Sequence, residues 1–338
     1  MMSTMPSSSS SSGIAIVGCG VLGTSLCKQL LSHPQFASRS ITGITKSTSR
    51  HEAIRREVLG VGHHAETAAA AGGGEEVNDR FQLVTMEEIL ASSSSTTFRD
   101  VVFCAPPSGF EDYPSAIEHA ATRLWTGIPN NNVGEKVVAE GEEEVVGSFV
   151  FTSSGAVYEG IDGETVDELS PTVSDATSNP RAYRMVQAEN ASIQQGGCAL
   201  RLAGLYTLER GAHNYWLDTS GTAKGRKTLG RADGIVNLLH YEDAASAVLA
   251  ALIVGPKVNS GQRFLISDGN PTTRRGICES AMKHARYREC TTMPPFLEVE
   301  KDGMEAAGPR GKVYDGRKSN EALGWKPKYS SFDEFMTL

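Results

Sequence analysis

The sequence predicts an α/β fold in which a doubly wound parallel sheet is covered by helices on both faces. Short apolar runs that fit buried strands occur at residues 14–17, 41–45, 81–84, 101–104, 149–151 and 199–202. Amphipathic patterns that fit helices lie between these runs and include residues 22–31, 49–59, 115–125 and 182–194. Strands that alternate with helices form parallel sheets, and continuously apolar strands are typical of sheets buried on both faces.

The composition favours a protein that acts on a small molecule. The chain has 338 residues, a formal net charge of −8 and 39% hydrophobic residues, enough for a large core. No uncharged apolar run approaches the ~20 residues of a membrane helix. The negative charge disfavours sequence-independent binding to nucleic acid. We therefore expect a small-molecule substrate, with neither nucleic acid nor a membrane as a partner.

The cysteines and the N-terminus bear on the compartment. The six cysteines form no C-x-x-C pair and no group with zinc-ligand spacing, which suits a reducing compartment and predicts no metal site. Residues 1–12 are Ser-rich and lack the basic start and apolar stretch of a secretory signal. We expect a disordered tail and a cytoplasmic protein, with an organelle as the alternative. Residues 63–76, 91–97 and 130–147 read as mobile surface loops.

A glycine-rich turn follows the first expected strand and opens the first expected helix. Its sequence is Gly18-Cys19-Gly20-Val21-Leu22-Gly23, and residues 18–23 are called the glycine turn below. In such a turn the first glycine permits the tight bend, the second lets a pyrophosphate approach the backbone, and the third lets helix and strand pack closely. The N-terminus of the helix then offers free N–H groups to the phosphates. The pattern predicts a Rossmann-type dinucleotide-binding domain; the alternative is a glycine turn that binds nothing.

The residues after the second strand indicate which dinucleotide binds. A site for NAD usually has a carboxylate there that holds the ribose 2′-hydroxyl. This chain has no Asp or Glu before Glu52, and the strand instead ends at Thr45-Lys46, with Arg50 shortly after. Two cations without a carboxylate favour the 2′-phosphate of NADP, so NAD is the less expected cofactor. The alternative is that Lys46 and Arg50 are ordinary solvated side chains.

Further candidate residues follow the later strands, because ligands of open α/β sheets bind at the carboxyl ends of the strands. Ala105 and Pro106 follow the fourth strand and are expected to contact the cofactor. The fifth strand runs into Thr152-Ser153-Ser154, which places the hydroxyl of Ser154 at this edge. A helix that starts after Pro180 carries Tyr183 and Gln187 four residues apart, on one face.

With these motifs in order, residues 13–335 resemble the short-chain dehydrogenase/reductase superfamily, in its extended and atypical branch of NAD(P)-dependent epimerase/dehydratase-like proteins. The matching segments are Ser153-Ser154-Gly155-Ala156-Val157-Tyr158-Glu159, Tyr183 to Gln187, Arg201 to Thr207, Val236 to Asp243, and Ser319 to Pro327. The resemblance implies that Ser154 orients a carbonyl or hydroxyl and that Tyr183 transfers a proton. It also implies that Gly204 lies at the cofactor and that the chain forms a possible homodimer.

The resemblance and the strand pattern together suggest the domain organisation. We expect residues 13–202, with a return segment at 235–254, to form the Rossmann domain. Residues 203–234 and 255–338 are then expected to form a small substrate-side region. A basic segment at residues 221–228 is interpreted as a surface loop near substrate or cofactor.

Two departures from the family pattern leave the function open. Gln187 stands where the family has a lysine, and Glu159 replaces a common glycine. The lysine holds the nicotinamide ribose and favours the tyrosine phenolate through its charge, whereas a glutamine can only hydrogen-bond. We therefore carry two hypotheses. The first is an NADP-dependent oxidoreductase or epimerase/dehydratase-like enzyme acting on a small carbonyl or hydroxyl compound or a nucleotide sugar. The second is a catalytically weak dinucleotide-binding sensor or scaffold.

Each candidate side chain also has a purely structural interpretation. Tyr183 fits a half-buried helix tyrosine, and Ser154 fits a serine that satisfies backbone groups in a turn. His240 fits a residue that braces a loop, and Asp243 fits a cap of the helix that starts there.

Overall fold

The computed structural model describes residues 12–60, 79–91, 96–127, 146–160, 162–217, 228–290, 292–297 and 308–338. The Ser-rich tail up to residue 11 lies outside these ranges, as do residues 63–76, 92–95, 130–145 and 221–227. The loop and tail predictions for those segments therefore stay predictions. Within the described ranges, no helix is both long enough and apolar enough to cross a bilayer.

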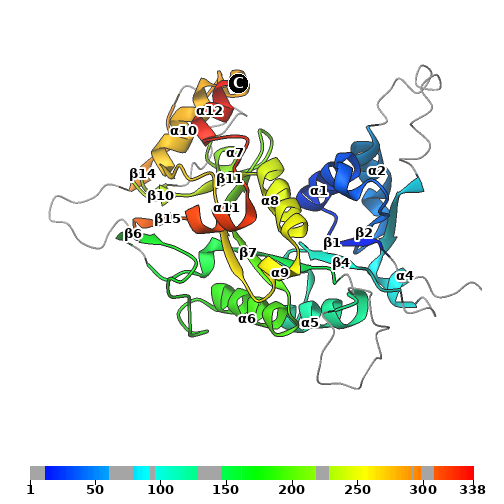
Figure 1. The fold of residues 1–338 in the computed structure, drawn as a ribbon. Helices are drawn as coiled ribbons and strands as arrows, with labels where there is room; N and C mark the ends of the chain where they lie inside the picture. The colour runs from blue at the N-terminus through cyan, green and yellow to red at the C-terminus, as the bar shows by residue number, and fades with distance from the viewer. Residues whose placement is uncertain are drawn as a thin grey trace, which may run out of the picture. The chain divides into compact units, whose positions relative to one another are not determined.

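The central sheet has seven strands and confirms the predicted doubly wound α/β fold (Figure 1). The strands are β1 (Ile14–Val17), β2 (Ile41–Thr45), β3 (Phe81–Thr85), β4 (Asp100–Phe103), β5 (Phe149–Ser154), β7 (Cys198–Leu202) and β12 (Arg263–Ile266). Their order is β12-β7-β5-β4-β1-β2-β3. β1 pairs in parallel with both β2 and β4, and β4 pairs in parallel with β5. The strand order therefore runs outward in opposite directions from β1 and β4. Ligands of open α/β sheets bind at such a switch point.

All six strands predicted from apolar runs are present, and their burial explains the signal. All four residues of β1 and all five of β7 are buried, so both strands lack a polar face. β12 was not predicted and corrects the expected assignment of residues 255–338 to a region outside the sheet. Its apolar run, Phe264-Leu265-Ile266, is as short as the run at residues 149–151 that predicted β5.

Contacts divide the chain into two compact units, each described here by itself. The first unit comprises the described parts of Met1–Thr152 with Ala188–Ala199 and Ala251–Gln262. Its helices are α1 (Val21–Ser32), α2 (His51–Leu59), α4 (Met86–Ala91), α5 (Tyr113–Leu124) and α9 (Pro256–Asn259). α1 and α2 lie on one side of the β1, β2 and β4 strands, and α5 lies on the other (Figure 1).

A buried ion pair lies at the amino end of β4 in the first unit. Arg39 Nη1 is 2.5 Å from Asp100 Oδ2, and both side chains are almost fully buried. The other Asp100 oxygen accepts a hydrogen bond from Ser148 N, and Arg39 also donates to the carbonyl oxygens of Ser12 and Gly13. The charges of both groups are thus compensated by partners rather than by water.

The second unit comprises Ser153–Gln187, Leu200–Ala250 and the described parts of Arg263–Leu338. Its short strands are β6 (Asp162–Val166), β8 (Gly204–Tyr206), β9 (Leu229–Arg231), β10 (Ile235–Val236), β11 (Leu238–His240), β13 (Thr272–Thr273), β14 (Phe296–Leu297) and β15 (Gly311–Tyr314). Its helices are α7 (Ala212–Trp216), α10 (Arg274–Lys283), α11 (Arg317–Leu323) and α12 (Phe332–Thr337). α6 (Pro180–Gln194) and α8 (Tyr241–Val254) contribute residues to both units.

The second unit has its own apolar core. Tyr206 of β8, Leu238 of β11, Ile277 of α10 and Phe332 of α12 are buried together in it. The irregular pattern expected after residue 202 corresponds to four two-stranded sheets, which pair β10 with β13, β11 with β8, β14 with β9, and β15 with β6.

Candidate functional site

The backbone of the glycine turn passes close to the loop after β4. Gly18 has a φ of 92°, and its N–H donates to Ile44 O at 2.9 Å. A Cβ on Gly18 would lie 2.3 Å from Ala105 N, a distance that no side chain can adopt. Gly18 is therefore required both by its backbone conformation and by this close approach. The structure thus brings Ala105 against the turn, and its contact with a cofactor stays a prediction.

The other two glycines of the turn differ in what surrounds them. A Cβ on Gly23 would lie 2.8 Å from Gly18 O and 3.2 Å from Ile16 Cγ2, so this glycine allows helix and strand to pack. A Cβ on Gly20 would meet only Gly18 O, at 4.0 Å. Gly20 therefore faces open space, which is the space that a pyrophosphate needs.

The N-terminus of α1 is left without a side-chain cap. Its N-cap is Gly20, no side chain caps the first turn, and no acidic residue lies in that turn. The first N–H groups of a helix have no partner within the helix and attract anions. Val21, Leu22 and Gly23 provide the first of these groups, so the residues present fit a bound dinucleotide phosphate.

The loop after β4 completes this part of the first unit. Cys104 Sγ donates to Gly18 O at 3.2 Å, and Ala105 O accepts a hydrogen bond from Tyr113 OH at 2.7 Å. Pro106 follows and is exposed. The carboxyl ends of β1 and β4 therefore meet at the point where the strand order reverses.

The end of β2 carries the two cations singled out from the sequence. Lys46 and Arg50 are exposed, and neither forms an ion pair with a described residue. Thr45 Oγ1 lies 2.6 Å from His51 Nε2, which ties the end of β2 to the start of α2.

Two acids of this part of the chain, Glu52 and Glu88, are engaged with other partners. Glu52 pairs with Arg56 at 2.7 Å on the surface of α2. Glu88 accepts hydrogen bonds from the N–H and hydroxyl of Thr85, and these bonds lower the pKa of its carboxyl.

The expected catalytic residues belong to the second unit. Ser154 ends β5, and its Oγ accepts a hydrogen bond from Ala156 N at 3.2 Å. This contact agrees with the structural interpretation of a serine that satisfies a turn. The Ser154 side chain is nevertheless only half-buried, whereas Ser153 is buried. The next residue, Gly155, packs against the ring of Tyr314 so closely that a Cβ there would lie 2.4 Å from it.

Tyr183 and Gln187 lie one turn apart on the same face of α6, and both are half-buried. Asn179 precedes the helix, and its side chain accepts a hydrogen bond from Ala182 N at 3.1 Å. Ala182 and Ala188 lie on the opposite face of α6 and are buried. The helix is thus anchored by small residues, while the phenol and the amide keep partial access to solvent.

Gly204 opens β8 and is exposed. Its N–H donates to Asn237 O at 3.0 Å, and a Cβ there would lie 3.1 Å from the same oxygen. Arg201, three residues earlier, is buried with its guanidinium 4.7 Å from the centre of the Tyr158 ring. Arg201 and Tyr158, which belong to two different family-like segments, therefore pack against each other.

A group of buried ionisable side chains surrounds Tyr206 in the second unit. His240 packs edge-on against Tyr206, with ring centres 5.3 Å apart, and its Nδ1 accepts a hydrogen bond from Glu242 N. These contacts fit the interpretation of His240 as a residue that braces its surroundings, and burial lowers its pKa. Asp243 was interpreted as a helix cap, but its carboxylate accepts hydrogen bonds from Lys328 N and Tyr329 N instead.

Asp268, which the sequence did not single out, is the most perturbed acid of this group. Its Oδ1 accepts a hydrogen bond from Asn270 N at 2.9 Å, while its Oδ2 is buried without a described hydrogen-bond partner. Burial raises the pKa of Asp268 to about 7, and the nearby charge of Asp243 contributes in the same direction. A buried acid of this kind becomes recognisable only from tertiary contacts.

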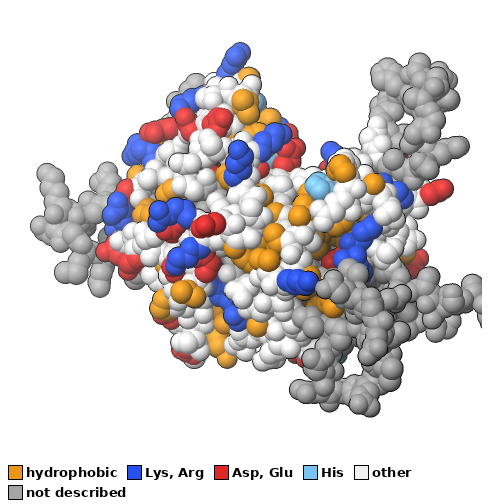
Figure 2. Space-filling model, viewed as in Figure 1, with side chains coloured by type: hydrophobic (Ala, Val, Ile, Leu, Met, Phe, Trp, Pro, Cys, Tyr) orange, Lys and Arg blue, Asp and Glu red, His pale blue; other side chains and the backbone are white. Residues whose placement is uncertain are grey.

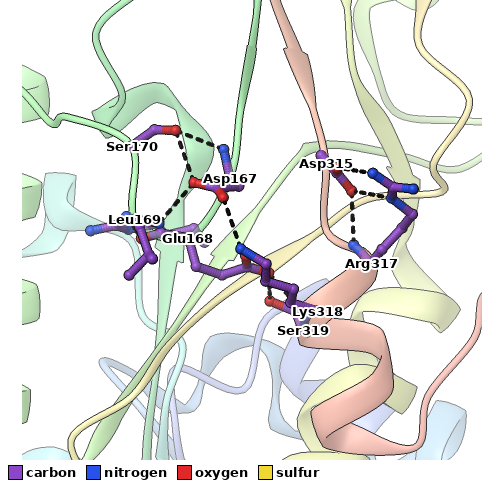
Figure 3. Close-up of polar contacts among 9 residues, drawn as sticks. Asp167, Glu168, Leu169, Ser170, Asp315, Arg317, Lys318 and Ser319 are labelled. Carbon is purple, nitrogen blue, oxygen red and sulfur yellow. Dashed lines mark hydrogen bonds and ion pairs between the residues drawn. The ribbon is translucent and has the colours of Figure 1, made fainter.

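A surface pocket of about 510 Å³ lies beside α11 in the second unit, where acidic and basic side chains are interspersed (Figure 2). It is lined by Asp167, Asp315, Arg317, Lys318 and Glu321. Figure 3 shows Lys318 pointing to Asp167 at 3.2 Å and Arg317 forming two bonds with Asp315. Both lining cations are thus paired. The Lys318–Asp167 pair ties the segment after β6 to the start of α11, while the Arg317–Asp315 pair is local.

Solved structures, rather than matches in sequence, identify the fold. No protein-family model and no curated protein matches the chain by sequence.

Three solved structures align over nearly the whole chain. The UDP-glucuronic acid 4-epimerase of Bacillus cereus, in complex with UDP-glucuronic acid and NAD, shares 16% identity, covers 96% of both chains and has a TM-score of 0.66. A dTDP-glucose 4,6-dehydratase of Bacillus anthracis with NAD shares 15% identity over 96% of this chain and 95% of its own, with a TM-score of 0.62. A conserved protein of unknown function from Silicibacter pomeroyi shares 18% identity over 97% of both chains, with a TM-score of 0.64. The chain therefore has the fold of NAD-dependent epimerase/dehydratase structures, as its resemblance to the extended short-chain dehydrogenases/reductases predicts.

Proposed function

We propose that the chain binds NADP at the glycine turn and acts as an NADP-dependent oxidoreductase or epimerase/dehydratase-like enzyme. Its substrate is a small carbonyl or hydroxyl compound or a nucleotide sugar. The observation that carries the proposal is the glycine turn, where Gly20 faces open space and the N-terminus of α1 has no side-chain cap.

The preference for NADP rests on the residues after β2. The related epimerase and dehydratase structures named above hold NAD, so the fold alone does not favour the phosphorylated cofactor. Lys46 and Arg50 supply two exposed positive charges where an NAD site has a carboxylate, and Glu52 and Glu88 are engaged with other partners.

The second unit supplies the groups proposed to act on the substrate. When bound, the dinucleotide supplies the hydride donor or acceptor. Ser154 presents a half-buried hydroxyl that can hydrogen-bond a carbonyl or hydroxyl of the substrate. Tyr183 presents a phenol that can give or take the accompanying proton, and Gln187 can hydrogen-bond a ribose hydroxyl but brings no charge.

Gln187 also supports a second candidate, a dinucleotide-binding sensor or scaffold with weak catalysis. Without a lysine at position 187, general acid/base help worth roughly a hundredfold to ten-thousandfold is reduced. Turnover of NADPH with carbonyl compounds and nucleotide sugars separates the two candidates, since a sensor binds the dinucleotide without consuming it.

The binding step is tested with Gly20→Val. The new side chain occupies the open space at the turn, so NADPH binding measured by calorimetric titration should fall below detection. The thermal unfolding midpoint should change little, because the valine meets only Gly18 O at the surface. Normal NADPH binding by a folded variant would show that the phosphates bind elsewhere.

A further inference from the structure

Two thiols lie together within and behind the glycine turn of the first unit. Cys19 sits between Gly18 and Gly20, and Cys27 lies two helical turns into α1. Their Sγ atoms are 3.9 Å apart, within hydrogen-bonding range for sulfur, and both thiols are free. Thr24 Oγ1 lies 4.0 Å from Cys19 Sγ on the same helix.

We propose that Cys19 and Cys27 form a reversible disulfide when the protein meets hydrogen peroxide, and that this bond weakens dinucleotide binding at the glycine turn. The site of modification rests on the geometry of the two thiols alone. Its effect on the cofactor rests also on the proposed function.

The two thiols differ in the way that a reactive and a resolving cysteine differ. The contact with the Cys27 thiol, aided by the Thr24 hydroxyl, lowers the pKa of Cys19 despite its burial. The same contact and full burial raise the pKa of Cys27. Cys19 is therefore the thiol that attacks the peroxide, and Cys27 is the resolving thiol.

Exposure gives the same order of reaction. The Cys19 side chain lies in the turn and is 3% exposed, whereas Cys27 is 0% exposed. The Cys19 side chain packs toward β2, because a Cβ on Gly43 would lie 3.1 Å from Cys19 Sγ, so peroxide reaches this sulfur when the turn opens locally. Cys27 is the more deeply buried of the two thiols and lies in contact with Cys19, as a resolving thiol does.

The chemistry balances in two steps. The Cys19 thiolate attacks one peroxide oxygen, the O–O bond breaks, and hydroxide leaves, so Cys19 becomes a sulfenic acid and the peroxide is reduced. The Cys27 sulfur then attacks the Cys19 sulfur and displaces the hydroxyl, which leaves as water with the thiol proton. Two thiols lose two electrons in total, and one hydrogen peroxide becomes two waters once the hydroxide is protonated.

The bond has a direct consequence for the turn. A disulfide holds its sulfurs about 2.05 Å apart, so the two Sγ atoms must approach by about 2 Å. Gly18 cannot follow Cys19 freely, because the backbone of Ala105 occupies the space beside it. The approach therefore displaces the rest of the turn or the start of α1, whose first N–H groups are proposed to bind the phosphates. Loss of one such bond to a phosphate weakens binding by about tenfold or more.

The experiment uses the full-length reduced protein, treated with hydrogen peroxide with and without saturating NADPH. Peptide mass spectrometry without reductant maps the disulfide, and calorimetric titration measures NADPH affinity before oxidation, after it, and after dithiothreitol. Cys27→Ala should stop at a Cys19 sulfenic acid that dimedone captures. Cys198→Ala, which removes another fully buried thiol of the first unit, should still form the disulfide.

We expect a Cys19–Cys27 linkage, NADPH binding at least about tenfold weaker, recovery with dithiothreitol, and slower oxidation in the presence of NADPH. Absence of the linkage in oxidised unmodified protein overturns the inference whether or not Cys27→Ala folds. A linkage that leaves NADPH affinity unchanged overturns the proposed effect on binding. If the reduced protein binds no dinucleotide but still forms the linkage, the proposed function fails while the modification site stands.

Discussion

Asp268 makes the stability of the protein depend on pH in an unusual direction. Its Oδ2 is buried without a described hydrogen-bond partner, and burial raises the pKa of the carboxyl from 3.8 to about 7. The folded protein therefore keeps this proton up to about pH 7, whereas the unfolded chain releases it near pH 4. Between these values the folded state binds more protons, so the free energy of unfolding falls as pH rises.

The size of the effect follows from the shift. About three pKa units at 1.36 kcal/mol each correspond to roughly 4 kcal/mol of stability lost between about pH 4 and pH 7. Above pH 7 the contribution is constant, because both states are then ionised. Asp268→Asn removes the titrating group and keeps an oxygen that can accept the bond from Asn270 N.

Urea unfolding of the unmodified protein and of Asp268→Asn, at several pH values from about 4 to 8, tests this reasoning. The difference between their unfolding free energies should change by up to about 4 kcal/mol across the window, with the variant gaining relative stability as pH rises. Asp315→Asn is the matched control: Arg317 lowers the pKa of Asp315 to about 2, so this acid titrates below the window. Parallel pH profiles for Asp268→Asn and the unmodified protein would refute the buried, protonated carboxyl.

Three further predictions follow from the first unit and from α6. NADPH should bind about tenfold to a hundredfold more tightly than NADH in calorimetric titrations, and Lys46→Asp should reverse the order; equal affinities in the unmodified protein would contradict the proposed cofactor. Gln187→Lys should raise turnover at neutral pH and shift the pH–rate profile toward neutrality, with Tyr183→Phe as the inactive control; a fully active Tyr183→Phe would exclude the phenol as the proton donor. Arg39→Ala should lower the free energy of unfolding by about 3–5 kcal/mol in urea titrations, because Asp100 is left charged and buried; a loss below about 1 kcal/mol would mean that the pair is solvated.

The sheet was predictable because its strands leave a strong local signal. Residues 14–17 and 41–45 are predicted with the same bounds as β1 and β2. β1 is apolar at all four positions, as is typical of parallel strands buried on both faces, whereas the large apolar residues of β2 are Ile41 and Ile44. Gly18 and Gly23 were predictable for a related reason: the close approaches they allow recur wherever a strand, a tight turn and a helix follow one another.

Other features depend on contacts that no local pattern carries. The pairing of β12 with β7 and the burial of Asp268 bring together segments far apart in the sequence. Cys19 and Cys27 are eight residues apart, and their contact depends on how the turn enters α1. Asp243 has the pattern of a helix cap but serves the backbone of residues 328 and 329, which lie far downstream.

The contrast among the three glycines of the turn sets the limits for re-engineering the proposed dinucleotide site. Substitutions at Gly18 or Gly23 introduce a side chain that clashes with Ala105 or crowds Ile16, so a mutant library should leave both positions unchanged. Lys46 and Arg50 project from the surface beyond β2, so substitutions there disturb no packing. Selection for a new dinucleotide can therefore search the rim of the site in full while the turn itself is kept invariant.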